Sequence, residues 1–222
     1  MKIGLIIAIA RELEAFLQSG ENRTAETVAG RTVYHTVING HEIYAVQSGC
    51  GEIDAAAAAM LLIARFDCDT ILNFGVTGAL EEDLRVEDLF VVEKVCHYDY
   101  DTSPIDPVVP GQYTEYPDAF IPLSPDLVRL AQSKGLRCVA AASGDKFVED
   151  RTEKLRLRAL GCSICDMEIA AIARTCERCG VRCLSVKCIS DTFDGNGGDF
   201  TQNVARSAEK AFRALREIIC IL

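Results

Sequence analysis

Uninterrupted apolar runs alternate with segments of helical spacing along the whole chain. The first run, from Lys2 to Ile9, offers no polar face, and Thr70 to Phe74 and Leu184 to Asp191 are similar runs. A strand without a polar face is typical of a sheet that helices cover on both sides. The pattern therefore predicts an α/β fold in three layers, α/β/α, with a mixed, mostly parallel central sheet.

The remaining elements fit this architecture. Asn39-Gly40 lies between two runs rich in β-branched and aromatic residues, which predicts a hairpin over 31–47. Further strands are expected over 89–95, over 137–142 and just before Asp166. Helices are expected over 11–17, 53–65, 125–134, 152–160 and 200–221, and one more begins after Glu168 and has Cys176 and Cys179 in its last turn. Because no repeat or linker interrupts the pattern, we expect residues 1–222 to form a single domain.

Composition limits the classes of protein to consider. Hydrophobic residues make up 49% of the 222 residues, which excludes a disordered chain. The formal net charge is −10 and the 23 basic residues are scattered, so we expect no nucleic-acid or membrane partner. No apolar run has the length of a bilayer span, and the N-terminal segment lacks a signal-peptide cleavage site. We therefore expect a cytoplasmic protein.

Eleven cysteines allow two interpretations. The odd number and the position of several cysteines inside apolar strands predict reduced, buried thiols. The alternative is a structural zinc site, because Cys162-x-x-Cys165 and Cys176-x-x-Cys179 have a zinc-ribbon spacing. The first pair runs into a predicted strand and the second ends a predicted helix, without the tight turns of a zinc site. We therefore expect no metal and no cofactor.

Carboxylates follow several predicted strands at the edge where open α/β sheets bind ligands. Glu12 comes just after the first strand, Glu168 follows a short one, and Asp191 ends another. Helix capping and a turn are the purely structural explanations for such residues. The glycines of Gly75–Gly78 would let a ligand approach the backbone, and they fit a tight strand-to-helix turn equally well.

Three carboxylates with an aromatic side chain predict a ligand that carries hydroxyl groups and a flat ring. A carboxylate accepts two hydrogen bonds at once, which suits a ribose diol, and Phe147 offers a ring that stacks on a base. Nucleophilic catalysis has little support, because none of the three histidines has the local signature of a catalytic pair. The residues alone therefore favour a nucleoside site.

Seven segments match a known family in order and span nearly the whole chain. They are MKIGLIIAIARELEAF, SGCGEIDAAAA, NFGVTGAL, HYDYD, SGDKFV, DMEIAAIA and CISDTFD. In these segments the chain resembles the 5′-methylthioadenosine/S-adenosylhomocysteine nucleosidases of the nucleoside phosphorylase superfamily. The resemblance implies a nucleoside phosphorylase-like fold and hydrolysis of the N-glycosidic bond of 5′-substituted adenine nucleosides, with adenine and a ribose derivative as products. It also implies a homodimer whose partner chain closes the 5′ side of each site.

The same resemblance implies a role for each matching residue. Glu12 would activate the attacking water, and Asp191 would be the general acid that protonates N7 of adenine. The residues implied in substrate binding are Ser190 beside the acid, Glu168 at the ribose hydroxyls, Met167 beneath the sugar, Val76 in the sugar-side wall, Phe147 stacked on adenine, the Val148 backbone at its edge and Phe200 over the 5′ side.

Chemistry agrees with these roles. Glycoside cleavage passes through an oxocarbenium-like state that carboxylates stabilise, and adenine is a poor leaving group until it is protonated. Asp191 must therefore hold a proton near neutral pH, and burial shifts a carboxyl pKa in that direction. We accordingly predict that Asp191 is largely buried.

Three positions depart from the family, and two other functions stay open. Val76 stands where a serine is usual, Lys187 replaces an arginine, and Asp166 replaces a glutamate. We predict that Lys187 changes how Asp191 is held. A phosphorylase of the same superfamily would use phosphate in place of water, but the expected arginine and hydroxyl ligands are missing at Asn73 and Val76. A non-catalytic nucleoside-binding protein would not need all three carboxylates.

Overall fold

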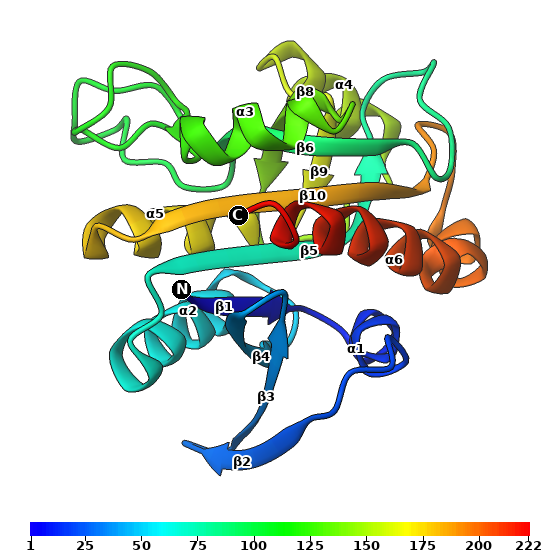
Figure 1. Ribbon diagram of the computed structural model, residues 1–222. Helices are drawn as coiled ribbons and strands as arrows, with labels where there is room; N and C mark the ends of the chain where they lie inside the picture. Colours follow the sequence, from blue (N-terminus) through cyan, green and yellow to red (C-terminus); the bar gives the residue numbers. More distant parts are fainter.

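Ten strands pair into one mixed sheet in the computed structural model, which describes all 222 residues (Figure 1). The strands are β1 (Lys2–Ile7), β2 (Thr24–Val28), β3 (Arg31–Ile38), β4 (His41–Gln47), β5 (Thr70–Ala79), β6 (Leu89–His97), β7 (Ile121–Pro122), β8 (Arg137–Ser143), β9 (Ile164–Asp166) and β10 (Arg182–Asp191). The helices are α1 (Ala10–Leu17), α2 (Glu52–Phe66), α3 (Pro125–Ser133), α4 (Arg151–Ala159), α5 (Ile169–Cys179) and α6 (Gly197–Ile219).

The strand order brings three strand ends to one edge of the sheet. The order is β10-β6-β8-β9-β5-β1-β4-β3-β2, with β7 paired to β6. β10 also pairs with β5, so β5, β10, β6, β8 and β9 close into a ring. Since β1 and β10 both run parallel to β5, the carboxyl ends of these three strands lie close together.

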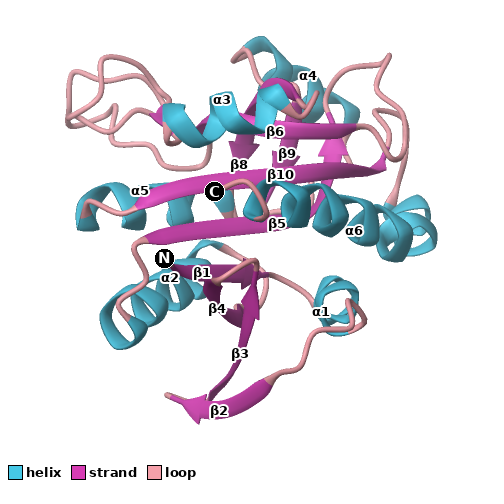
Figure 2. Cartoon of the chain, in the orientation of Figure 1, coloured by secondary structure: helices cyan, strands magenta, loops and turns pink.

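Helices cover both faces of the sheet, which confirms the predicted three-layer α/β fold. α6 crosses one face over β5 and β10 and packs against α1, whereas α5 lies behind these strands and packs against α2 (Figure 2). β1 and β5 are buried along almost their whole length, which explains their uninterrupted apolar runs. No helix is both long and apolar enough to cross a membrane.

The predicted hairpin is confirmed as β3 and β4. Asn39 and Gly40 join the two strands with φ angles of 50° and 82°, as a two-residue hairpin turn of type I′ requires. The neighbouring edge strand β2 was not predicted from the sequence. Its residues are exposed at four of five positions and pair only with β3, so it carries no apolar signal.

Of the two interpretations of Gly75–Gly78, the tight strand-to-helix turn is excluded, because β5 continues through these residues to Ala79. β10 pairs with this part of β5 along one side, and β9 pairs with Gly78 and Ala79 along the other. The glycines therefore belong to a central strand, where they make room for side chains from neighbouring elements.

Candidate active site

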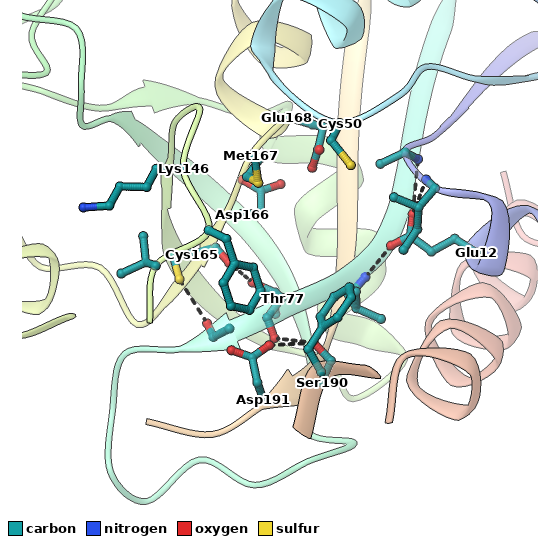
Figure 3. Close-up of a pocket in the computed structure, with 17 residues that line it drawn as sticks. Glu12, Cys50, Thr77, Lys146, Cys165, Asp166, Met167, Glu168, Ser190 and Asp191 are labelled. Carbon is teal, nitrogen blue, oxygen red and sulfur yellow. Dashed lines mark hydrogen bonds between the residues drawn. The ribbon is translucent and has the colours of Figure 1, made fainter. Parts of the chain in front are cut away.

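A cavity of about 350 Å³ opens where β1, β5, β9 and β10 end. All nine site residues predicted from the sequence line it: Glu12, Val76, Phe147, Val148, Met167, Glu168, Ser190, Asp191 and Phe200. Figure 3 shows Glu12, Glu168 and Asp191 on three different sides of this cavity. Segments far apart in the sequence thus supply one set of polar and aromatic groups.

Glu12 lies in the first turn of α1 and is held by backbone amides. Its Oε1 accepts a hydrogen bond from the amide of Val76 at 2.8 Å, and its Oε2 accepts two more at 3.2 Å from amides just after β1. A Cβ on Gly75 would lie 2.4 Å from Oε1, so only glycine leaves room for the carboxylate. Burial raises the pKa of Glu12, although the charge of Lys187 and the amide donors oppose this shift.

Asp191 ends β10 at a β-bulge and has 2% of its surface exposed, which confirms the predicted burial. Its Oδ1 accepts a hydrogen bond from the Ser190 hydroxyl at 2.8 Å. A Cβ on Gly78 would lie 2.9 Å from its Oδ2, so the carboxyl packs against the backbone of β5. Burial raises the pKa of Asp191, while the Ser190 hydrogen bond and the charge of Lys154 oppose the shift.

Glu168 lies between β9 and α5 and is also buried. Its side chain does not cap α5; its Oε1 instead accepts the amide of Gly51 at 3.1 Å. Burial and the charge of Asp166 raise the pKa of Glu168 to about 7. Helix capping, the structural explanation considered above, applies to Glu12, whose Oε2 accepts the amide of Ile9 at the start of α1. Near the start of α5, Oδ2 of Asp166 accepts the amide of Ile169 at 3.3 Å.

The prediction that Lys187 changes how Asp191 is held was wrong. The Lys187 Nζ lies 2.9 Å from Oδ2 of Asp166, and both side chains are 2% exposed. Burial lowers the pKa of Lys187, but the charges of Asp166, Glu168 and Glu12 outweigh it, so that the net shift is upward. Lys187 is therefore the shared counter-ion of three carboxylates on the side of the cavity that holds Glu12 and Glu168.

Apolar side chains complete the cavity. The rings of Phe147 and Phe200 meet edge to face with 5.6 Å between their centroids. Phe147 comes from the loop before α4 and keeps 43% of its surface exposed, whereas Phe200 comes from the first turns of α6. Val76 and Met167 add apolar surface from β5 and from the end of β9. The cavity thus combines a partly aromatic wall with buried carboxyl groups.

The site predictions left out eight of the residues that line the cavity: Ala8, Ile9, Cys50, Thr77, Gly78, Lys146, Cys165 and Asp166. Thr77 donates a hydrogen bond from its hydroxyl to the backbone carbonyl of Cys165 at 2.7 Å. In the sequence these residues look like ordinary strand or turn positions, so no pattern distinguishes them. All eleven cysteines are free, and no group of three or more His, Cys, Asp or Glu side chains is placed to hold a metal ion.

Comparisons with known proteins agree with this geometry. The family model described as the phosphorylase superfamily matches residues 2–220. A 5′-methylthioadenosine/S-adenosylhomocysteine nucleosidase of Shewanella piezotolerans is 31% identical over 93% of this chain and 94% of its own length.

Two solved structures from Helicobacter pylori share the fold. A mutant nucleosidase with 5′-methylthioadenosine in its active site is 27% identical, with a TM-score of 0.93 over 100% of this chain and 99% of that one. A futalosine hydrolase is 27% identical, with a TM-score of 0.94, and the match covers 100% of this chain and 98% of the hydrolase. The chain therefore belongs to the phosphorylase superfamily and, within it, to the 5′-methylthioadenosine/S-adenosylhomocysteine nucleosidase family.

Proposed function

We propose that the protein hydrolyses the N-glycosidic bond of 5′-substituted adenine nucleosides and releases adenine. The observation that carries the proposal is the placement of three buried carboxyls, Glu12, Glu168 and Asp191, around one cavity with an aromatic wall. Methylthioadenosine and S-adenosylhomocysteine are the proposed substrates, because the relatives of this chain bear these names.

The roles proposed for the carboxyls follow from their surroundings. Backbone amides hold the Glu12 carboxylate in place. Its remaining lone pairs are available to orient and activate a water molecule. Glu168, whose Oε1 is fixed by a backbone amide, would accept hydrogen bonds from the ribose diol. Asp191 lies in surroundings that favour its protonated form, as donation of a proton to N7 of adenine requires. Phe147 and Phe200 would enclose the base and the 5′ substituent.

The charge of the cavity favours water over phosphate as the nucleophile. Four carboxyl groups line it, and Lys146 is the one cation among the lining residues. Asn73 uses its amide inside the core, where it donates to the Ile6 carbonyl at 3.1 Å. Arg11 points to α6 and donates to the Thr201 carbonyl at 2.9 Å. A phosphate dianion needs several donors, and these surroundings would repel it.

Product analysis tests the function. Methylthioadenosine, S-adenosylhomocysteine, 5′-deoxyadenosine, adenosine, inosine and futalosine are each incubated with the purified protein, with and without phosphate. We expect adenine from the first two substrates at a rate that does not depend on phosphate. Turnover only with phosphate would establish a phosphorylase instead. Binding without turnover in either condition would establish a nucleoside-binding protein.

We further propose a cytoplasmic homodimer whose partner chain borders the 5′ side of the cavity. Its support is an apolar surface that starts at the cavity, since Cys50 precedes α2 and α2 exposes Ile53 at 82% and Met60 at 47%. The loop between β6 and β7 also exposes apolar side chains, Ile105 at 83% and Val109 at 56%. Exposed apolar residues of this kind are typical of interfaces. Sedimentation equilibrium is expected to give the mass of two chains, and the mass of one chain at micromolar concentration would contradict this.

A further inference from the structure

A second buried lysine lies outside the cavity. Lys154 belongs to α4, has 0% of its surface exposed and forms no ion pair with a carboxylate. Its Nζ instead donates to three backbone carbonyls, those of Phe193 at 2.9 Å, Thr192 at 3.1 Å and Gly195 at 3.4 Å. A buried ammonium group is costly unless its donors are satisfied, so this loop and this side chain hold one another in place.

The loop that Lys154 holds connects two parts of the active site. Residues 192–196 join Asp191, at the end of β10, to α6, which carries Phe200. Three weaker contacts cross the same gap, two from Arg151 at the start of α4 and one from the segment before it. The exposed Arg151 guanidinium lies 4.7 Å from the centroid of the Phe193 ring. Arg151 pairs with Asp194, with side chains 58% and 76% exposed, and Glu149 accepts the amide of Gly197 at 3.3 Å. Exposed pairs of this kind contribute little. The buried lysine is therefore the main attachment of the loop to α4.

We propose that Lys154 is a positioning residue for Asp191, because it anchors the loop that fixes both this carboxyl and the start of α6. The role rests on the proposed function of Asp191 as a general acid. Lys154 acts through its geometry, by ordering the backbone directly after the acid, and through its charge.

The positive charge of Lys154 lowers the pKa of Asp191. Besides burial, the groups that act on Asp191 are Ser190 on its own strand, Lys154 on α4, Asp199 on α6 and Glu149 before α4. Cys165, from β9, also lies close, and burial keeps this thiol neutral by raising its pKa. Lys154 is the cation among these groups. It therefore limits how far burial raises the pKa of Asp191.

Replacement of Lys154 tests the proposal through the pH profile of adenine release. In Lys154→Met we expect kcat to fall by roughly tenfold, because Asp191 loses its fixed position. We also expect the alkaline limb of kcat/KM to move up by at least about half a pH unit, because the nearby cation is lost. Lys154→Arg keeps the charge with a different shape, so kcat should fall while the limb stays in place. Arg158→Met removes an exposed cation from the same helix and should change neither.

The outcomes separate this role from a purely structural one and from the proposed function. Turnover by the unaltered protein tests the function itself, independently of Lys154. A Lys154→Met variant that only melts at a lower temperature, with its alkaline limb unmoved, would overturn the positioning role. Lys154→Gln, which keeps donors for the loop carbonyls, replaces the Met variant in the same comparison if that variant does not fold.

Discussion

Asp191→Asn is expected to lower kcat/KM for adenine release by about 10²–10⁴-fold, the usual contribution of a general acid. Asparagine keeps the size of the side chain and a partner for the Ser190 hydroxyl, but it has no acidic proton to give to the leaving base. Binding of the nucleoside should change much less, because the cavity keeps its shape. Steady-state kinetics with methylthioadenosine and a binding titration measure the two effects separately.

The same substitution should stabilise the folded protein at high pH. Burial raises the pKa of Asp191 above its unperturbed value of 3.8, so the native state binds more protons than the unfolded state between these two pKa values. The stabilisation that this group contributes is therefore complete below its pKa in the unfolded state. It is lost as the pH rises through its pKa in the folded state. A neutral amide avoids this loss. The Tm of Asp191→Asn should exceed that of the unaltered protein above the folded pKa, and the difference should vanish in acid.

Asp83→Asn is the matched control, because it changes an exposed carboxylate that makes no hydrogen bond or ion pair. Neither its activity nor the pH dependence of its Tm should differ from those of the unaltered protein. Full activity in Asp191→Asn would contradict the acid role. A Tm difference that did not depend on pH would show that folding does not shift the pKa of Asp191.

The carboxylates of the site were predictable because of their position along the chain. Glu12 and Asp191 each lie at or just beyond the end of an apolar run, and the carboxyl ends of parallel strands meet at one edge of the sheet. The path of β5 was less predictable. Its glycines are typical of turns, yet at Gly75 and Gly78 the missing Cβ makes room for the carboxyl groups of those two residues. A local pattern cannot reveal a requirement that comes from other elements.

The buried lysines show the same limit. Lys187 lies inside an apolar strand and Lys154 inside a charged helix, and neither pattern indicates a buried ammonium group. Their partners come from distant parts of the chain: Asp166 for Lys187, and the loop after β10 for Lys154. The resemblance to a family identified Lys187 as unusual but gave it the wrong partner. Only tertiary contacts distinguish the two roles.

Lys187→Met is expected to destabilise the protein by about 3–5 kcal/mol, the usual cost of removing one partner of a buried ion pair. Asp166 would then be left as a buried charge, and its Oδ1 already has no hydrogen-bond partner. Chemical denaturation measures the loss. Lys187→Met combined with Asp166→Asn removes both charges and should recover most of the stability. Lys187→Arg keeps the charge and should stay close to the unaltered protein.

Lys187→Met should also weaken catalysis by a route that differs from loss of the acid. The charge of Lys187 lowers the pKa of both Glu12 and Glu168, and without it burial raises both pKa values further. Glu12 accepts a proton only in its ionised form, so activity rises with pH through its pKa. The acidic limb of kcat/KM should therefore move to higher pH in Lys187→Met, whereas in Lys154→Met the alkaline limb moves.

An acidic limb that stayed in place would mean that Glu12 does not act as the base, or that Lys187 does not govern its charge. In Asp191→Asn the acidic limb should not move, because the surroundings of Glu12 are unchanged.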